Sequence, residues 1–201
     1  MRPDAIRPSN LQQVRYPENV RVEIVEPASV AKFTEPVAEL YDLVFSAPPH
    51  QWTTSEKSRH REVLPGLLSA GSLAVVQDES GLIGAAYGYP PAPDGSWWRD
   101  VRGDLLTPGF AEEWPGRTFV LSGLAVHPNR RRTGVGRALV YRILADRPER
   151  RAAYSVMPGA VAVHTLIGQP QLKPVGRRVF PKGAGIDSMD YYVLALPVTK
   201  P

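Results

Sequence analysis

A strand, a glycine- and arginine-rich turn and an amphipathic helix follow one another between residues 117 and 144. This run constrains the fold more than any other part of the chain. The apolar segment 117–126 predicts a strand, and the next ten residues, 127–136, read HPNRRRTGVG. Beyond this turn an apolar stripe recurs at helical spacing and predicts a helix that packs on a core; its members are Val135, Leu139, Val140, Ile143 and Leu144.

The turn predicts a binding site for an anion. The first N–H groups of a helix have no partner within the helix and lie at the positive end of its dipole. Gly134 and Gly136 allow a ligand to approach the backbone closely. Positive charge gathers around the same point, at positions 130, 131, 132 and 137. The pattern is typical of a phosphate cradle, although an ordinary strand–turn–helix junction with solvated arginines would read the same way.

Spacing excludes two common phosphate-binding motifs. A P-loop needs a Lys-Ser/Thr pair after its last glycine, and here Arg137 and Ala138 follow Gly136. The dinucleotide fingerprint needs a third glycine, where this chain has Leu139. It also needs an acidic residue about 20 positions further on, and residues 153–156 read AYSV.

What remains is a strand, Val126-x-Pro128, Arg131-x-x-Gly134-x-Gly136 and a helix, in that order. This order resembles the pyrophosphate-binding motif of the GNAT superfamily of N-acetyltransferases, which use acetyl-CoA. The resemblance implies an α+β fold with a mixed, mostly antiparallel twisted sheet of about six to seven strands, flanked by about four helices. It extends over residues 21–198, which we expect to form a single domain after an N-terminal arm of residues 1–20.

Periodicity elsewhere agrees with that order of elements. We expect strands at 21–25, 73–77, 82–89, 117–126, 151–157, 176–180 and 191–198. We expect helices at 37–45, 53–68, 135–144 and 160–167. Thr53 and Glu56 form a capping box at the start of the second helix, which Pro65 should kink or shorten.

Composition limits the other classes of function. The chain has no cysteine and only four histidines, dispersed at 50, 60, 127 and 164, so we expect no metal site. No apolar run reaches the length of a membrane span and no signal segment begins the chain, which favours a cytoplasmic protein without a membrane partner. The net charge of +4 comes largely from the turn and from residues 147–151, which we interpret as a solvated loop. Without interleaved aromatic residues, nucleic acid is not an expected partner.

The resemblance implies that acetyl-CoA is the co-substrate and assigns its binding residues. The strand would align the pantetheine arm, and one of its N–H groups would polarise the thioester carbonyl. The turn would hold the pyrophosphate through backbone amides. Carried over by position, these residues are Leu124, Ala125, Val126, Arg131, Arg132, Thr133, Gly134, Val135, Gly136, Arg137 and Ala138. Arg132 replaces a usual glycine, and Thr133 replaces a frequent arginine or glutamine.

Proton transfer has several candidate residues. Many relatives have a glutamate as general base where this chain has Gly123, and the adjacent Ser122 could orient a water. A water relay, a carboxylate from the segment 90–116 or an acceptor amine of low pKa all stay open. His164 stands where the family often has a tyrosine that protonates the thiolate, so it is a candidate general acid. It could equally be a packing or surface residue. We expect His50 and His60 at the surface without partners.

The long segment 90–116 is a candidate for binding the acceptor, because long connections usually carry a function. Trp97 and Trp98 lie among carboxylates there, a combination that suits an amine through cation–π and ionic contacts. Tyr87 and Tyr89 would line the neighbouring wall. The tryptophans could instead only fix the loop to the protein body.

The sequence therefore predicts an acetyl-CoA-dependent N-acetyltransferase. It would transfer the acetyl group to a small amine, such as an amino acid derivative, a polyamine or an amine-containing antibiotic, by direct attack on the thioester. The alternatives are acetylation of a protein or peptide amine, and a catalytically weak acyl-CoA-binding sensor. We expect a monomer or a homodimer.

Overall fold

The computed structural model describes residues 20–145, 147–158, 160, 172–182 and 185–196. Its contacts divide the chain into two compact units. Of the described residues, the α4 unit comprises 20–89 and 121–145, and the β6–β7 unit comprises 90–120, 147–158, 160, 172–182 and 185–196. Strand β4 (Thr118–Val126) contributes residues to both. The expected domain bounds of 21–198 stay a prediction.

The α4 unit combines strands with three α-helices. Its strands are β1 (Glu23–Ile24), β2 (Ser72–Asp78), β3 (Gly81–Tyr89) and the later part of β4. Its helices are α1 (Thr34–Phe45), α2 (Thr54–Ser69) and α4 (Val135–Leu144), with short 3-10 turns η2 (Pro27–Phe33) and η4 (Pro128–Arg130). Both β1–β2 and β2–β3 pair antiparallel.

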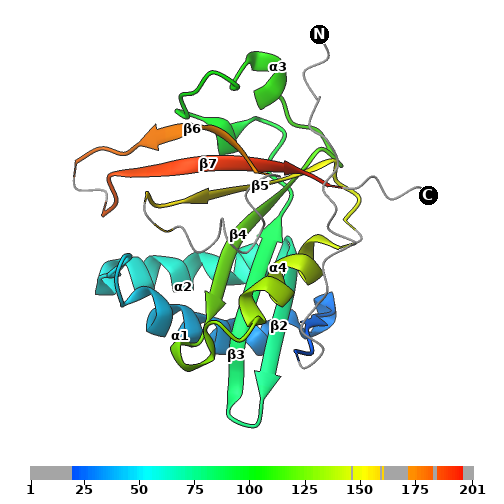
Figure 1. The fold of residues 1–201 in the computed structure, drawn as a ribbon, viewed down its shortest axis with the longest axis vertical. Coiled ribbons are helices and arrows are strands. Elements are labelled where there is room, and N and C mark those ends of the chain that lie inside the picture. Colours follow the sequence, from blue (N-terminus) through cyan, green and yellow to red (C-terminus); the bar gives the residue numbers. More distant parts are fainter. Residues whose placement is uncertain (1–19, 146, 159, 161–171, 183–184, 197–201) are drawn as a thin grey trace. The chain divides into compact units, whose positions relative to one another are not determined.

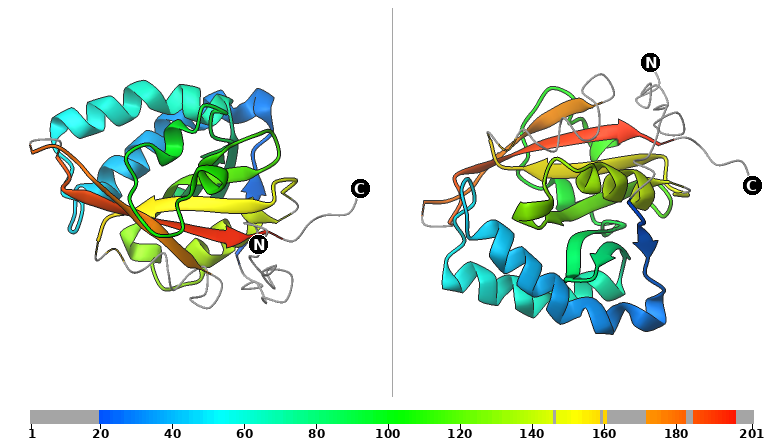
Figure 2. Two further views of the ribbon diagram at one scale, coloured as in Figure 1. Left: turned by 90° about the horizontal axis from the view of Figure 1, so that it is seen from above. Right: turned by 60° about the horizontal axis from the view of Figure 1, so that its bottom comes forward.

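Helix α4 packs on one face of β3, and α1 packs on the other. Successive residues of a strand point to opposite sides, so β3 offers side chains to both. At Gly84 a Cβ atom would come within 2.7 Å of Val135 and 2.9 Å of Leu139, so α4 packs directly on this glycine. Tyr87, three residues on, packs its ring 5.5 Å from that of Tyr41 on α1. The right view of Figure 2 shows α1 and α2 on one side of β2 and β3 and α4 on the other.

The β6–β7 unit is built on β5 (Arg151–Val156), β6 (Lys173–Val179) and β7 (Ser188–Ala195). Both β5–β7 and β6–β7 pair antiparallel, while Thr118 to Val120 of β4 pair in parallel with Arg151 to Ala153. The segment 90–116 contains η3 (Ser96–Trp98) and α3 (Pro108–Ala111). Among the described residues, the hydrogen-bonding order of the strands is β1-β2-β3-β4-β5-β7-β6 (Figure 1).

The mixed, mostly antiparallel α+β fold that the sequence predicts is thus confirmed. The hairpin β2–β3 turns at residues 79–80 as expected, and the apolar stripe of α4 is buried throughout. Thr53 and Glu56 form the expected capping box, but Pro65 lies inside α2, which continues to Ser69. The predicted helix at 160–167 lies almost wholly outside the described residues. Among the helices that the structure describes, none has both the length and the apolar character to cross a membrane.

One expectation about charge is wrong. The segment 147–151 is not simply a solvated loop, because two of its three arginines, Arg147 and Arg151, are engaged within the β6–β7 unit, while Arg150 is exposed. Arg147 donates two hydrogen bonds to Glu149, at 2.8 and 2.6 Å, and its guanidinium lies 4.0 Å from the centre of the Phe119 ring. Arg151 is only 4% exposed and pairs with Glu113 at 2.9 Å.

Candidate functional site

The predicted phosphate cradle lies where β4 passes into α4. The N–H of His127 donates to the carbonyl of Ile83 at 2.8 Å, so the strand stays paired with β3 up to the turn. The backbone then reverses through η4, and Arg132 and Gly134 adopt left-handed conformations with φ of 64° and 91°. Gly134 is the N-cap of α4, whose first internal hydrogen bond runs from Ala138 N to Gly134 O at 2.9 Å.

The start of α4 is open to an anion. Gly134 has no side chain with which to cap the helix, and no side-chain cap bond is formed there. The first N–H groups of a helix have no carbonyl four residues earlier to receive them, so they depend on another acceptor. Around them Arg131, Arg132 and Arg137 are exposed. The resulting arrangement of helix dipole, amides and cations favours a phosphate or pyrophosphate.

Arg130 has a structural role beside this helix start. It holds the tip of the β2–β3 hairpin, donating from Nε and Nη2 to Asp78 at 3.1 and 2.8 Å. Hydrogen bonds from Ser80 and then from Arg130 lower the pKa of Asp78 to about 2. Thr133 closes the turn by donating from its hydroxyl to the carbonyl of Arg130 at 2.7 Å. These bonds set the path of the chain into α4.

A second group of residues lies around Gly123 on β4. A Cβ atom at this position would overlap the hydroxyl of Tyr41 and the ring of Tyr87. The volume that a side chain at 123 would need is therefore filled by two tyrosines from α1 and β3. Tyr41 is 2% exposed, and its hydroxyl has no hydrogen-bond partner among the described residues. Burial, followed by the effect of Tyr87, raises the pKa of Tyr41 well above its ordinary value.

His60 belongs to this group, and the expectation that it lies at the surface without a partner is wrong. It is 9% exposed, its ring stacks on Tyr41 at 4.9 Å, and its Nε2 is 3.2 Å from the hydroxyl of Tyr87. Desolvation lowers the pKa of His60 from its ordinary value. The sequence held a signal for this, because His60, Leu64 and Leu68 recur every four residues and form the buried side of α2.

Tyr87 completes the group, and Ser122 is next to Gly123 in the chain. Ser122 is exposed on β4. Burial and then Tyr89 raise the pKa of Tyr87, an effect that Ser122 partly opposes. His50, also expected without partners, is half-buried with its ring 4.4 Å from that of Phe45, which corrects that expectation too.

The predicted acceptor segment 90–116 is fixed by a buried polar network in the β6–β7 unit. Glu113 accepts hydrogen bonds from Trp98 Nε1 at 2.7 Å, from Thr118 at 2.9 Å and from Arg151 at 2.9 Å. Trp98 is 3% exposed, an environment that favours the loop-fixing role for this residue. Trp97 is half-buried against Tyr191, with ring centres 5.4 Å apart. Binding of an acceptor by Trp97, Trp98, Tyr87 and Tyr89 stays a prediction.

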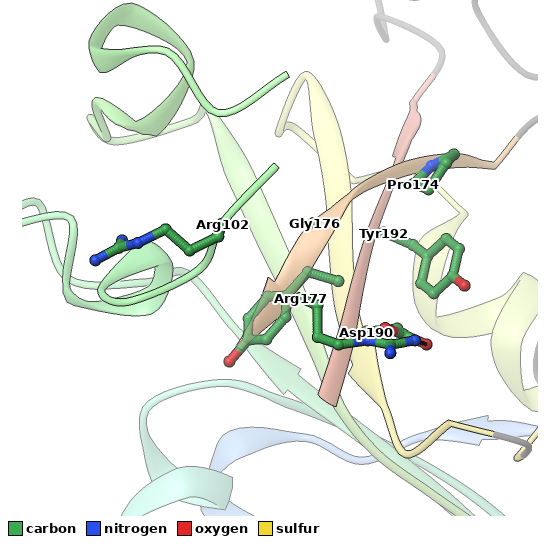
Figure 3. Close-up of a pocket in the computed structure, with 7 residues that line it drawn as sticks. Arg102, Pro174, Gly176, Arg177, Asp190 and Tyr192 are labelled. Carbon is green, nitrogen blue, oxygen red and sulfur yellow. Dashed lines mark hydrogen bonds and ion pairs between the residues drawn. The ribbon is translucent and has the colours of Figure 1, made fainter. Parts of the chain in front are cut away.

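A pocket of about 370 Å³ opens on the same unit, beside β6 and β7 (Figure 3). Its charges are largely paired within the protein, since Arg177 donates to Asp190 at 2.6 and 3.1 Å. None of the predicted site residues lines it. Its lining residues are Arg102, Pro174, Gly176, Arg177, Asp190, Tyr191 and Tyr192.

Two further expectations concern the general acid and metal binding. His164, the candidate general acid, lies outside the described residues. Within the part of the chain that is described, no cluster of three or more histidine or acidic side chains could hold a metal ion.

Comparison with known proteins finds a match to one sequence family and many solved structures with a similar fold. The sequence model described as "Acetyltransferase (GNAT) family" matches residues 37–165, well over half of the chain. A comparison with curated proteins gives no match.

The solved structures share the fold at low sequence identity. A ribosomal-protein-S18-alanine N-acetyltransferase from Escherichia coli has a TM-score of 0.59 and 12% identity, covering 90% of this chain and 96% of its own. A putative acetyltransferase of the GNAT family from Desulfovibrio desulfuricans has a TM-score of 0.60 and 16% identity, covering 89% and 99%. A GNAT family acetyltransferase from Elizabethkingia anophelis, solved with acetyl-CoA bound, has a TM-score of 0.55 and 14% identity, covering 89% and 99%.

Proposed function

Since this chain belongs to the acetyltransferase (GNAT) family, we propose that it is an N-acetyltransferase that moves the acetyl group of acetyl-CoA onto the amine of a small molecule. The observation that carries the proposal is the uncapped start of α4 at Gly134, surrounded by exposed arginines. That arrangement suits the pyrophosphate of CoA. In the proposal, residues Arg131 to Ala138 hold the pyrophosphate and Leu124 to Val126 align the pantetheine arm.

Acetyl-CoA supplies an activated acyl group, and the protein has to supply a neutral amine and protonate the leaving thiolate. Deprotonating an alkyl ammonium group with a pKa near 10.4 costs about 4–5 kcal/mol of free energy at neutral pH. Gly123 provides no carboxylate for the proton that the attacking nitrogen must lose. The thiolate needs a general acid, a role that we assign to His164 as a proposal.

Binding of the donor is tested by charge reversal at the cradle. Arg137→Glu places an anion in the first turn of α4, which suits the helix dipole and should leave folding intact. It also repels a pyrophosphate. Reversing one charge about 4 Å away in water costs about 2 kcal/mol, or roughly thirtyfold in the Kd for acetyl-CoA at low salt. The matched control is Arg59→Glu, exposed on α2, across β3 from α4. Equal affinity in both variants would contradict the proposed cradle.

The acceptor is tested with a panel followed by release of free CoA thiol. We would use spermidine, tyramine, lysine amide and kanamycin, together with a short alanine-terminated peptide. Turnover of a small amine is the expected result. Turnover confined to the peptide would instead favour protein acetylation, and tight acetyl-CoA binding without turnover of any amine would favour an acyl-CoA sensor.

A further inference from the structure

The tip of the β2–β3 hairpin holds the turn that leads into α4. Arg130 donates from Nε and Nη2 to one carboxylate oxygen of Asp78, at 3.1 and 2.8 Å. The other oxygen of Asp78 accepts from the backbone N–H of Ser80 at 2.8 Å and from the Ser80 hydroxyl. Because both oxygens are engaged, the carboxylate has one orientation in the hairpin, and that orientation sets where the Arg130 side chain lies.

A further bond continues from Arg130 to the start of the helix. The Thr133 hydroxyl donates to the Arg130 carbonyl at 2.7 Å, and Gly134, the next residue, is the N-cap of α4. Side-chain hydrogen bonds therefore join the hairpin tip to the helix start through residues 130–133. We call the set of Asp78, Arg130 and Thr133 the hairpin clamp.

The hairpin clamp encloses a residue with a strained backbone. Arg132 lies between Arg130 and Thr133 and has a φ of 64°, a left-handed conformation that residues with a side chain disfavour by about five- to thirtyfold. Arg132 is exposed, and among the described residues no hydrogen bond or ion pair engages its side chain, so the side chain does not compensate the strain. Such a conformation persists only where the flanking structure imposes it. The flanking bonds here are those of the hairpin clamp.

We propose that Asp78 is a positioning residue for acetyl-CoA, because the hairpin clamp keeps Arg132 left-handed and so holds the cradle in the shape that binds the pyrophosphate. The inference rests on the proposed function. With the clamp in place, the turn is ordered before the ligand arrives. Without it, the turn relaxes to a backbone free of strain, and the observed affinity falls in proportion to the fraction of molecules that keep the binding conformation.

Charge alone predicts the opposite effect for Asp78. Its carboxylate is an anion that is bonded to the same turn as the proposed pyrophosphate site. Coulomb repulsion between the carboxylate and a bound pyrophosphate weakens binding, so removal of the carboxylate would strengthen binding if charge were the whole effect. A loss of affinity on removal of Asp78 therefore reports the position of the turn rather than its charge.

The test is the Kd for acetyl-CoA, measured by calorimetry at about 0.15 M salt, where long-range effects of charge are screened. Asp78→Ala should raise this Kd by about five- to thirtyfold, the factor by which the left-handed backbone is disfavoured. In steady-state assays the KM for acetyl-CoA should rise by a similar factor. The kcat at saturating acetyl-CoA and the KM for the amine should not change, because the variant alters only the binding of the donor.

The matched control is Asp42→Ala in the same unit. Asp42 on α1 accepts from Nε and Nη2 of Arg61 on α2 at 2.9 and 2.8 Å, so two donors of one arginine meet one carboxylate oxygen as they do at Asp78. Asp42→Ala should lower stability while leaving the Kd for acetyl-CoA within about twofold of the wild-type value. An equal rise of the Kd in both variants would mean a general loss of structure and would overturn the proposal.

Two substitutions at Arg132 isolate the strain. Arg132→Ala and Arg132→Gly remove the same charge, but only glycine adopts a left-handed backbone without strain. In the Arg132→Ala background, Asp78→Ala should keep its effect of about five- to thirtyfold on the Kd. In the Arg132→Gly background the effect should shrink to about twofold, because glycine populates both signs of φ about equally.

The outcomes separate this inference from the proposed function. Equal effects of Asp78→Ala in the two Arg132 backgrounds would overturn the positioning role while leaving the acetyltransferase proposal standing. Unchanged or tighter binding of acetyl-CoA by Asp78→Ala would do the same. A wild-type protein that binds no acetyl-CoA would overturn both.

Discussion

Replacing Gly123 by alanine tests the packing under β4 with a single methyl group. The added Cβ would lie 2.5 Å from Cζ of Tyr87, closer still to its Cε1, and in overlap with the hydroxyl of Tyr41. Both rings are almost fully buried, so neither can move aside without disturbing α1 or β3. Overpacking of this kind costs about 1–3 kcal/mol.

The net effect is smaller, because alanine is favoured over glycine within a strand by about 0.5–1 kcal/mol. Because three contacts of 2.5 Å or less put the overpacking at about 2–2.5 kcal/mol within that range, we expect Gly123→Ala to lower the free energy of unfolding by about 1–2 kcal/mol. For a chain of this length that corresponds to a fall in Tm of about 2–8 °C. The measurement is thermal and urea unfolding followed by circular dichroism.

The matched control is Gly66→Ala on helix α2, where nothing lies within 4 Å of the added Cβ. That substitution should instead stabilise the protein by about 0.5–1 kcal/mol. In the double variant Tyr41→Phe/Gly123→Ala, removal of the hydroxyl should recover part of the loss, with a coupling of about 0.5 kcal/mol or more. If Gly123→Ala matches the wild type, or if Tyr41→Phe recovers nothing, the packing argument is wrong.

Three further features of the structure are tested by substitution and equilibrium unfolding. Gly134→Ala forces a side chain into a backbone with φ of 91° and should cost about 1–2 kcal/mol, with weaker acetyl-CoA binding; unchanged stability would argue against the strained turn. Glu113→Ala should cost about 3–5 kcal/mol by removing the carboxylate that faces buried Arg151, whereas Asp190→Asn at a more exposed pair should cost much less, and similar losses would refute the distinction. The pKa of Asp78 falls from 3.8 to about 2 on folding, so its stabilising effect is present above pH 3.8 and lost as the pH falls through about 2. The Tm of Asp78→Asn should therefore lie below that of the wild type at pH 6 and converge with it near pH 2, and a constant difference would contradict this.

The elements that were predictable from sequence are those whose signals are local. The capping box of Thr53 and Glu56, the hairpin β2–β3 and the buried stripe of α4 each depend on residues within about ten positions of one another. The path of the turn into α4 was predictable in the same way, because glycine spacing controls the backbone there. Arg132 shows the limit of that reasoning: it holds a left-handed conformation that a glycine would adopt without strain.

Sequence by itself determined the order of the elements and the presence of an open, basic helix start after β4, because hydrogen bonding along a helix and alternation along a strand are properties of neighbouring residues. Only the tertiary structure decided which distant side chains meet. It placed His60 against Tyr87, 27 positions away, and Arg151 against Glu113, 38 positions away. Either pair could equally have been solvated, since a polar residue is buried only when the fold brings it a hydrogen-bonding partner.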